Sequence, residues 1–343
     1  MAKYDKEGLK NLRSQIKERQ LKDVYIIFGD EDFLKEYYIN EIKKLIVEEG
    51  FEEFNYSIFE GEKQDLEEIS MAFATPPMMA DKKLIVIKDS NIFKSATEEQ
   101  KTFWSDILKE KYEDVCLIFY ERAVDKRSVL YKAAAKAGES VECAYQQGTE
   151  LINWVMRGCR GAGKTIGEKE AEYLISNCDS GMNSIKRELE KLFSFCDTDK
   201  ITIADIDKIV TKMPQNRVFE MINDMLNKDG QKMFEKLEEL KSIKRSPQKG
   251  SAFGILSLLL MNFEKILKVK LLLEKGIAYK VVAGQLKIFS SQMYVYSSAA
   301  KAFSKPFLRE AICRIAQIDM DIKSGKVKEW LAVEQFLAWC INN

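Results

Sequence analysis

The sequence is 343 residues long and contains 54 basic and 54 acidic side chains, so its formal net charge is zero. Apolar residues make up 46% of it, which excludes a largely disordered chain. It contains no histidine. This excludes Ser-His-Asp and Cys-His catalysis and imidazole-ligated metals, and leaves carboxylates, lysine, tyrosine and cysteine as general acids and bases.

The seven cysteines are scattered through apolar segments, and none belongs to a CxxC pair. A zinc knuckle or a redox motif is therefore not indicated, and we expect a reduced protein without a metal or cofactor. The N-terminus has no apolar signal core, and no apolar run is long enough to cross a bilayer. The sequence predicts a cytoplasmic protein with no membrane contact.

Strand-like and helical segments alternate over the first 146 residues. The expected strands are Val24–Phe28, Asn55–Phe59, Leu84–Ile87, Val115–Tyr120 and Ser140–Ala144. The expected helices are 33–46, Asp65–Phe73, Glu98–Lys109 and Ser128–Lys136. Continuous apolar strands that alternate with helices are typical of a parallel sheet covered on both faces, so we predict an α/β fold for this part.

After about residue 146 the pattern becomes almost entirely helical. Short helices are predicted at Leu151–Arg157, Glu168–Asn177, Ser184–Phe195 and Ile203–Lys212. Longer amphipathic helices are predicted from Val218 onward, as at Gly254–Leu273, where apolar residues recur every three or four positions. The charge changes in parallel: residues 1–150 carry −8, residues 151–210 carry −1 and residues 211–343 carry +9. Such an asymmetry favours separate domains with different partners, although charge can also drift at random along a chain.

One segment matches the P-loop pattern GxxxxGK[ST], with Gly158, Gly163, Lys164 and Thr165 at the defining positions. A working P-loop follows a buried strand and opens a helix, so that backbone N–H groups surround the phosphates. Here residues 151–157 have helical spacing and the sheet lies upstream. We interpret the match as a glycine-rich turn between two helices. A P-loop NTPase is the alternative.

The residues after the first predicted strand also lack the phosphate-binding residues of a nucleotide site. The loop at 29–35 reads GDEDFLK, without GK[ST]. Three successive carboxylates, Asp30, Glu31 and Asp32, would repel a triphosphate. The domain therefore has the form of an NTPase core without a working nucleotide site.

Five stretches in a fixed order extend over nearly the whole chain. They are 24–34 (VYIIFGDEDFL), 75–87 (TPPMMADKKLIVI), 181–206 with RELEKL and ITIADI, 218–220 (VFE) and 318–325 (IDMDIKSG). Together they resemble the delta subunit of the bacterial DNA polymerase III clamp loader.

The resemblance implies three domains. Residues 1–146 would form an AAA+-like (RecA-like) parallel-sheet domain without a working P-loop, residues 147–212 a helical lid domain, and residues 213–343 a helical collar domain for oligomerisation. The fold class is then α/β followed by all-α.

The resemblance also implies a non-catalytic subunit of the DNA-directed DNA polymerase holoenzyme. It would bind the sliding clamp and open its ring, or hold it open, so that the ring is loaded on primed DNA during replication. Its partners would be the sliding clamp, the clamp-loader ATPase subunits, a delta-prime-type subunit and primed DNA, in the bacterial cytoplasm at the nucleoid or replisome. A general helical scaffold is a weaker alternative.

In this family two bulky residues before the third strand insert into an apolar pocket of the clamp. Met78 and Met79 occupy that position here, where leucine or phenylalanine would be more usual, and Phe73 could contribute. Flexible thioethers suit an adaptable pocket, and two prolines just before them stiffen the approach. The alternative is that both methionines are core residues at the end of the sheet.

Basic and aromatic residues of the last domain are candidates for contact with DNA. The basic cluster consists of Lys241, Lys244, Arg245 and Lys249. The aromatic group, a candidate for base stacking, consists of Phe289, Tyr294 and Tyr296. Phosphates attract such basic clusters, and bases stack on exposed aromatic rings. A solvated loop and a buried core, respectively, are the alternatives.

Overall fold

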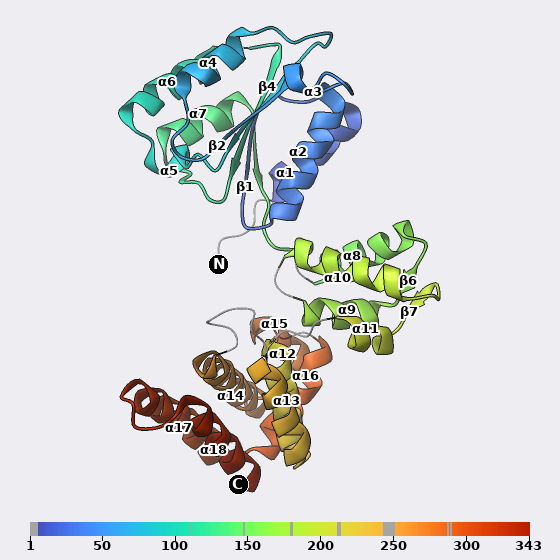
Figure 1. Cartoon of the computed structure of the whole chain (residues 1–343), viewed down its shortest axis with the longest axis vertical. Coiled ribbons are helices and arrows are strands. Elements are labelled where there is room, and N and C mark those ends of the chain that lie inside the picture. The colour runs from blue at the N-terminus through green and yellow to red at the C-terminus, as the bar shows by residue number, and fades with distance from the viewer. Residues whose placement is uncertain are drawn as a thin grey trace. The chain divides into compact units, whose positions relative to one another are not determined.

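The computed structural model describes residues 6–110, 112–146, 148–178, 181–210, 214–242, 251–286, 288 and 290–343. The chain divides into two compact units (Figure 1). The first contains residues 1–148 together with 180–184, and the second contains residues 149–179 and 185–343. The predicted division into three domains, with a boundary between lid and collar at residue 212, stays a prediction.

The first unit is built on a five-stranded sheet in the order β2-β3-β4-β1-β5, with all neighbouring strands parallel. The strands are β1 (Val24–Phe28), β2 (Tyr56–Glu60), β3 (Lys83–Lys88), β4 (Val115–Glu121) and β5 (Glu139–Glu142). Strands β3 and β4 are buried almost throughout, which is why residues 84–87 and 115–120 are apolar without interruption. The predicted α/β fold and its five strands are confirmed.

A helix precedes the first strand of the first unit, and the other helices of this unit lie between successive strands (Figure 1). They are α1 (Lys6–Glu18), α2 (Asp32–Ile46), α3 (Glu52–Asn55), α4 (Leu66–Ala74), α5 (Ile92–Ser95), α6 (Glu98–Lys109) and α7 (Val129–Ala137). The bounds of α6 match the prediction, and a capping box of Thr97 and Gln100 fixes its start. Helices α1, α3 and α5 were not predicted.

The register of the sheet determines which loops share an edge. Phe28, at the end of β1, is opposite Glu121, at the end of β4. The acidic loop after β1 therefore lies beside Glu121 at the carboxyl edge. At the other edge, Tyr56 of β2 is opposite Leu84 of β3, so the segment 75–82 enters the sheet beside the end of α3. The acidic loop therefore lies at one edge of the sheet, and the segment with Met78 and Met79 at the other.

Described residues of the second unit form helices and one small parallel pair of strands. The elements up to residue 209 are α8 (Thr149–Gly161), β6 (Thr165–Ile166), α9 (Glu168–Asn177), α10 (Met182–Phe195), β7 (Lys200–Ile201) and α11 (Ile203–Ile209). The first three residues of α10 belong to the first unit. The later helices are α12 (Pro214–Leu226), α13 (Gly230–Ser242), α14 (Ala252–Glu274), α15 (Tyr279–Leu286), α16 (Ser290–Ala302), α17 (Lys305–Lys323) and α18 (Glu329–Asn342). Helix α14 is apolar on most faces because it packs against α12, α16, α17 and α18.

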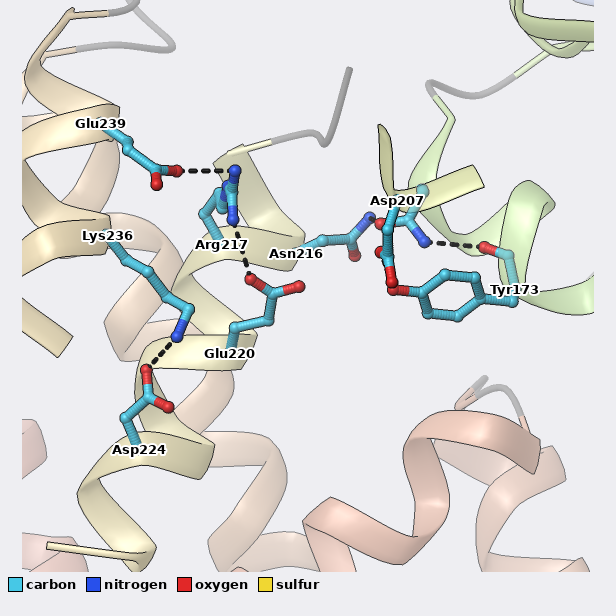
Figure 2. A network of polar contacts seen from close by, with 9 residues as sticks. Tyr173, Asp207, Asn216, Arg217, Glu220, Asp224, Lys236 and Glu239 are labelled. Carbon is cyan, nitrogen blue, oxygen red and sulfur yellow. Dashed lines mark hydrogen bonds and ion pairs between the residues drawn. The ribbon is translucent and has the colours of Figure 1, made fainter. Parts of the chain in front are cut away.

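A polar network connects the helices up to α11 with those that follow (Figure 2). Asn216, near the start of α12, donates its amide to the carbonyl of Ser176 at the end of α9. The next residue, Arg217, forms ion pairs with Glu220 at 3.2 Å and with Glu239 of α13 at 2.6 Å (Figure 2). These contacts fix the start of α12 within the second unit.

Candidate functional site

The segment 75–82, between α4 and β3, exposes two adjacent methionines. The side chains of Met78 and Met79 are 45% and 75% exposed. The next strand, β3, is buried from its first residue. The alternative that both methionines are core residues is therefore wrong for this structure. We call residues 75–82 the methionine loop.

A buried asparagine holds the backbone of the methionine loop. Asn55, at the end of α3, is 1% exposed. Its Oδ1 accepts the N–H of Met78 at 2.7 Å, and its Nδ2 donates to the carbonyl of Met78 at 2.7 Å. One side chain thus satisfies both polar groups of a single loop residue, as a neighbouring strand would. The next residue, Met79, has φ +55°, a left-handed conformation that is uncommon for a residue with a side chain.

Two lysines hold the ends of the methionine loop. Lys83, 4% exposed, donates from Nζ to the carbonyls of Ala72, Phe73 and Thr75, where α4 ends. Burial lowers the pKa of Lys83. Lys82 forms an ion pair with Asp23 at 2.5 Å, just before β1. The loop is therefore anchored near its start, at its centre and at its end.

Phe73 lies in the core of the first unit and not on its surface. It is 5% exposed, and its ring centroid is 4.9 Å from that of Tyr112. Its predicted part in clamp binding stays a prediction, but this position suits support of the loop and not insertion into a partner. The exposed large apolar side chain on this part of α4 is Met71, which was not among the predicted site residues.

At the opposite edge, the backbone groups of the acidic loop after β1 are used internally. Gly29 donates its N–H to the carbonyl of Glu121 at 3.2 Å, and Glu31 donates its N–H to Cys143 at 2.9 Å. A side chain at Gly29 would meet the Cys143 carbonyl, because an added Cβ would lie 2.2 Å from that oxygen. With φ +127°, Gly29 makes this close approach possible, and the N–H groups of Gly29 and Glu31 are not available to a phosphate.

Charged side chains at this carboxyl edge also find partners within the protein. Lys35, 1% exposed, forms an ion pair with Asp32 at 2.9 Å and lies 4.2 Å from the ring centroid of Tyr120. Glu121 accepts hydrogen bonds from Ser90 and Asn91, in the loop after β3. Burial raises the pKa of Glu121, against these hydrogen bonds. The polar groups here hold the loops together.

The segment that matches the P-loop pattern has a different architecture. Gly158 lies within α8, and Gly163, at φ +71°, follows its end. Lys164 donates from Nζ to the carbonyls of Cys196 at 2.6 Å and Thr198 at 2.9 Å, after the end of α10. Thr165 belongs to β6, which pairs with β7. The segment is a turn after a helix, as predicted, although a short strand follows it and not a helix directly.

The described residues offer neither a metal site nor a membrane-spanning helix. They contain no grouping of three or more cysteines and carboxylates able to hold a metal ion. Among the helices built from these residues, none combines the length and apolar character needed to cross a membrane.

Comparisons with known proteins agree over both parts of the chain. Residues 25–144 match the family model described as "DNA polymerase III, delta subunit", and residues 215–340 match that of its C-terminal domain. The DNA polymerase III subunit delta of Bacillus subtilis (strain 168) is 26% identical over 331 residues, which is 94% of each chain. The chain belongs to the DNA polymerase III delta subunit family.

A solved structure is similar to this delta-family chain over its whole length. The Bacillus subtilis DNA clamp loader delta protein has a TM-score of 0.57 and 23% sequence identity, with 98% of this chain and 100% of that chain covered. The likeness supports the fold. Family membership makes the chain a clamp-loader subunit of DNA replication, accessory to a polymerase.

The basic cluster of this delta-family chain is only partly described. Lys244, Arg245 and Lys249 lie outside the described residues. Lys241, at the end of α13, forms ion pairs with Glu238 at 2.6 Å and with Glu334 of α18 at 2.5 Å. Its charge is already compensated by two carboxylates, which disfavours contact of Lys241 with a phosphate.

The three aromatic residues do not form one exposed surface. Tyr294 is exposed on α16, but Tyr296 is buried, and its hydroxyl donates to Oδ1 of Asn262 at 2.5 Å. Phe289 lies outside the described residues. The proposed stacking role is wrong for Tyr296, since the two tyrosines, two positions apart, point to different sides of the helix.

Proposed function

We propose that this chain binds the sliding clamp through Met78 and Met79 and thereby opens the ring, or holds it open. One observation carries the contact site: two consecutive residues expose large apolar side chains on a loop whose backbone is held by hydrogen bonds. Burying each methionine in an apolar pocket would contribute roughly 1.5–3 kcal/mol. Ring opening is inferred from family membership.

The energy for loading would come from other subunits. Lys164, which the P-loop alternative requires, donates to carbonyl oxygens, and in the loop after β1 the N–H groups of Gly29 and Glu31 donate to carbonyls of Glu121 and Cys143. These contacts favour a subunit that hydrolyses no ATP and assembles with the loader ATPase subunits and a delta-prime-type subunit on primed DNA. They disfavour the NTPase alternative.

The contact is tested by surface plasmon resonance of the purified full chain on the immobilised sliding clamp, without ATP. We expect binding, and we expect the double variant Met78→Ala/Met79→Ala to lose at least a hundredfold in affinity, since about 3 kcal/mol or more of burial is removed. Met320→Ala is the matched control, because Met320 is 58% exposed on α17 in the second unit. Unchanged affinity of the double variant would show that the contact site lies elsewhere.

A further inference from the structure

We propose that Asn55 and Lys83 are positioning residues for clamp binding. They hold the methionine loop, before the clamp arrives, in the conformation that presents Met78 and Met79. This inference rests on the proposed function of the two methionines. Neither residue is placed at the surface where a clamp could reach it, so both would act only through the loop.

The contact of Asn55 is specific in chemistry and in direction. It donates to one backbone group of Met78 and accepts from the other, both at 2.7 Å. A side-chain amide is the group that offers a donor and an acceptor side by side; a carboxylate offers acceptors alone and an aliphatic side chain neither. Because Asn55 is buried beside the first residue of β2, its own position is set by the sheet. The sheet therefore determines where the backbone of Met78 lies.

The backbone conformation of Met79 indicates that surrounding contacts constrain the loop. Its φ of +55° is disfavoured for a side chain with a Cβ. Such conformations persist where the surroundings over-determine them, and they concentrate at functional segments. Here the hydrogen bonds at Met78 lie directly before the strained residue, and the ion pair of Lys82 with Asp23 lies three residues after it.

Lys83 fixes the other side of the same loop. A helix leaves its last carbonyls without intrahelical partners, and a lysine side chain can satisfy them. The Lys83 ammonium donates hydrogen bonds to the carbonyls of Ala72, Phe73 and Thr75. It therefore determines the direction in which the chain leaves α4. The two prolines follow at once and restrict the next residues. Lys83 thus fixes the backbone up to Thr75, and Asn55 fixes it at Met78, so only the two prolines lie between the two fixed points.

Preorganisation of this kind raises affinity by lowering the entropy lost on binding. Methionine has three rotatable side-chain bonds, so ordering it on a mobile loop is expensive. A loop with a fixed backbone loses only side-chain freedom when it binds. The expected effect of releasing the loop is an affinity about tenfold weaker.

The test measures clamp affinity of full-length Asn55→Ala, Asn55→Asp and Lys83→Met by surface plasmon resonance, with thermal melting of each. We expect about tenfold weaker binding for all three. Asn55→Asp keeps the size of the side chain but turns the donor that faces the Met78 carbonyl into an acceptor, so it separates hydrogen bonding from packing. Asn262→Ala is the matched control, because Asn262 is also buried and hydrogen-bonded, on α14. It should lower the melting temperature and leave clamp affinity unchanged.

A double-mutant cycle distinguishes positioning from a general loss of stability. In a Met79→Ala background, Asn55→Ala should weaken binding less than threefold, because part of what it positions is already gone. Full additivity, or wild-type affinity of Asn55→Asp, would overturn the inference. If Asn55→Ala fails to fold, the other two variants decide.

The proposed function and this inference can fail separately. If Met78→Ala/Met79→Ala binds the clamp normally, the proposed function is wrong. If that double variant loses binding while the Asn55 and Lys83 variants bind normally, only this inference is wrong.

Discussion

Both carboxylate oxygens of Glu31 lie 3.1 Å from the backbone nitrogen of Met182, the first residue of α10, and accept its N–H. Helix N-termini attract anions, because their first N–H groups have no partner and the helix dipole is positive there. Glu31 is 2% exposed. At the edge where an NTPase core would hold phosphate, this chain therefore supplies a buried anion of its own.

Replacing Glu31 with glutamine should change how stability depends on pH. Burial raises the pKa of Glu31 above 4.5, although the hydrogen bond from Met182 opposes this. A raised pKa in the folded state contributes stability that is complete below the unfolded pKa and is lost as pH rises through the folded pKa. Relative to Glu31→Gln, the wild type should therefore lose stability as pH rises from about 4.5 towards 7. Denaturant midpoints of both proteins across this range measure it, and parallel curves would contradict it.

Glycine and alanine should differ at position 79 in stability but not in binding. Both remove the methionine side chain, but alanine retains a Cβ in a left-handed conformation. We expect Met79→Gly to be more stable than Met79→Ala by about 1 kcal/mol. Clamp affinity should be reduced in both. Thermal melting and binding of the two purified variants provide the measurement; a more stable alanine variant would show that the backbone at residue 79 is not held in this conformation.

Lys164→Ala should lower the stability of the protein and should not change how its melting temperature responds to Mg-ATP. It removes two hydrogen bonds from an ammonium to the carbonyls after α10, which should lower stability by about 1 kcal/mol. Mg-ATP should leave the melting temperature of the wild type and of the variant unchanged. A bound nucleotide at 100 times its dissociation constant would add about 2.7 kcal/mol, so a shift seen only in the wild type would restore the P-loop interpretation.

The basic cluster predicts a salt-dependent effect on DNA binding by the assembled loader. If Lys244, Arg245 and Lys249 each contact a phosphate, alanine at all three positions should lower the slope of log K against log salt by about 0.9 per contact. Lys241→Ala should leave the slope nearly unchanged, because Glu238 and Glu334 already compensate its charge. Fluorescence anisotropy on primed DNA at several salt concentrations measures both slopes. Equal slopes for the triple variant and the wild type would remove the cluster from the DNA contact.

Local patterns in the sequence were sufficient to predict most elements that position the site. The strands β1 and β4 are continuous apolar runs, and α6 is bounded by its own capping residues. Short helices such as α3, with four residues, carry too little periodicity to be recognised. Asn55 was missed for that reason and for another: its partner, Met78, lies 23 residues later in the chain.

Side-chain exposure was the property that sequence patterns predicted least well. Phe73 and Met71 are two residues apart on α4, yet one is buried and the other exposed. Tyr296 and Tyr294 show the same division on α16. Apolar spacing indicates that a helix has a buried face, but the neighbours that cover it come from distant segments, such as Tyr112 over Phe73.

By itself, the sequence determined the α/β-then-helical order, the likeness to the delta subunit family and the pair of methionines before β3, since these are encoded in contiguous residues. Tertiary structure decided which polar groups remain available to a ligand. Lys164 lies in the segment that matches the P-loop pattern, and Glu31 and Lys35 follow β1, where an NTPase core would hold phosphate. Each contacts a group from a distant segment: Lys164 the carbonyl of Cys196, Lys35 the carbonyl of Glu121 and Glu31 the N–H of Met182. Buried polar groups must find partners, and folding brings those partners from segments that no local pattern connects.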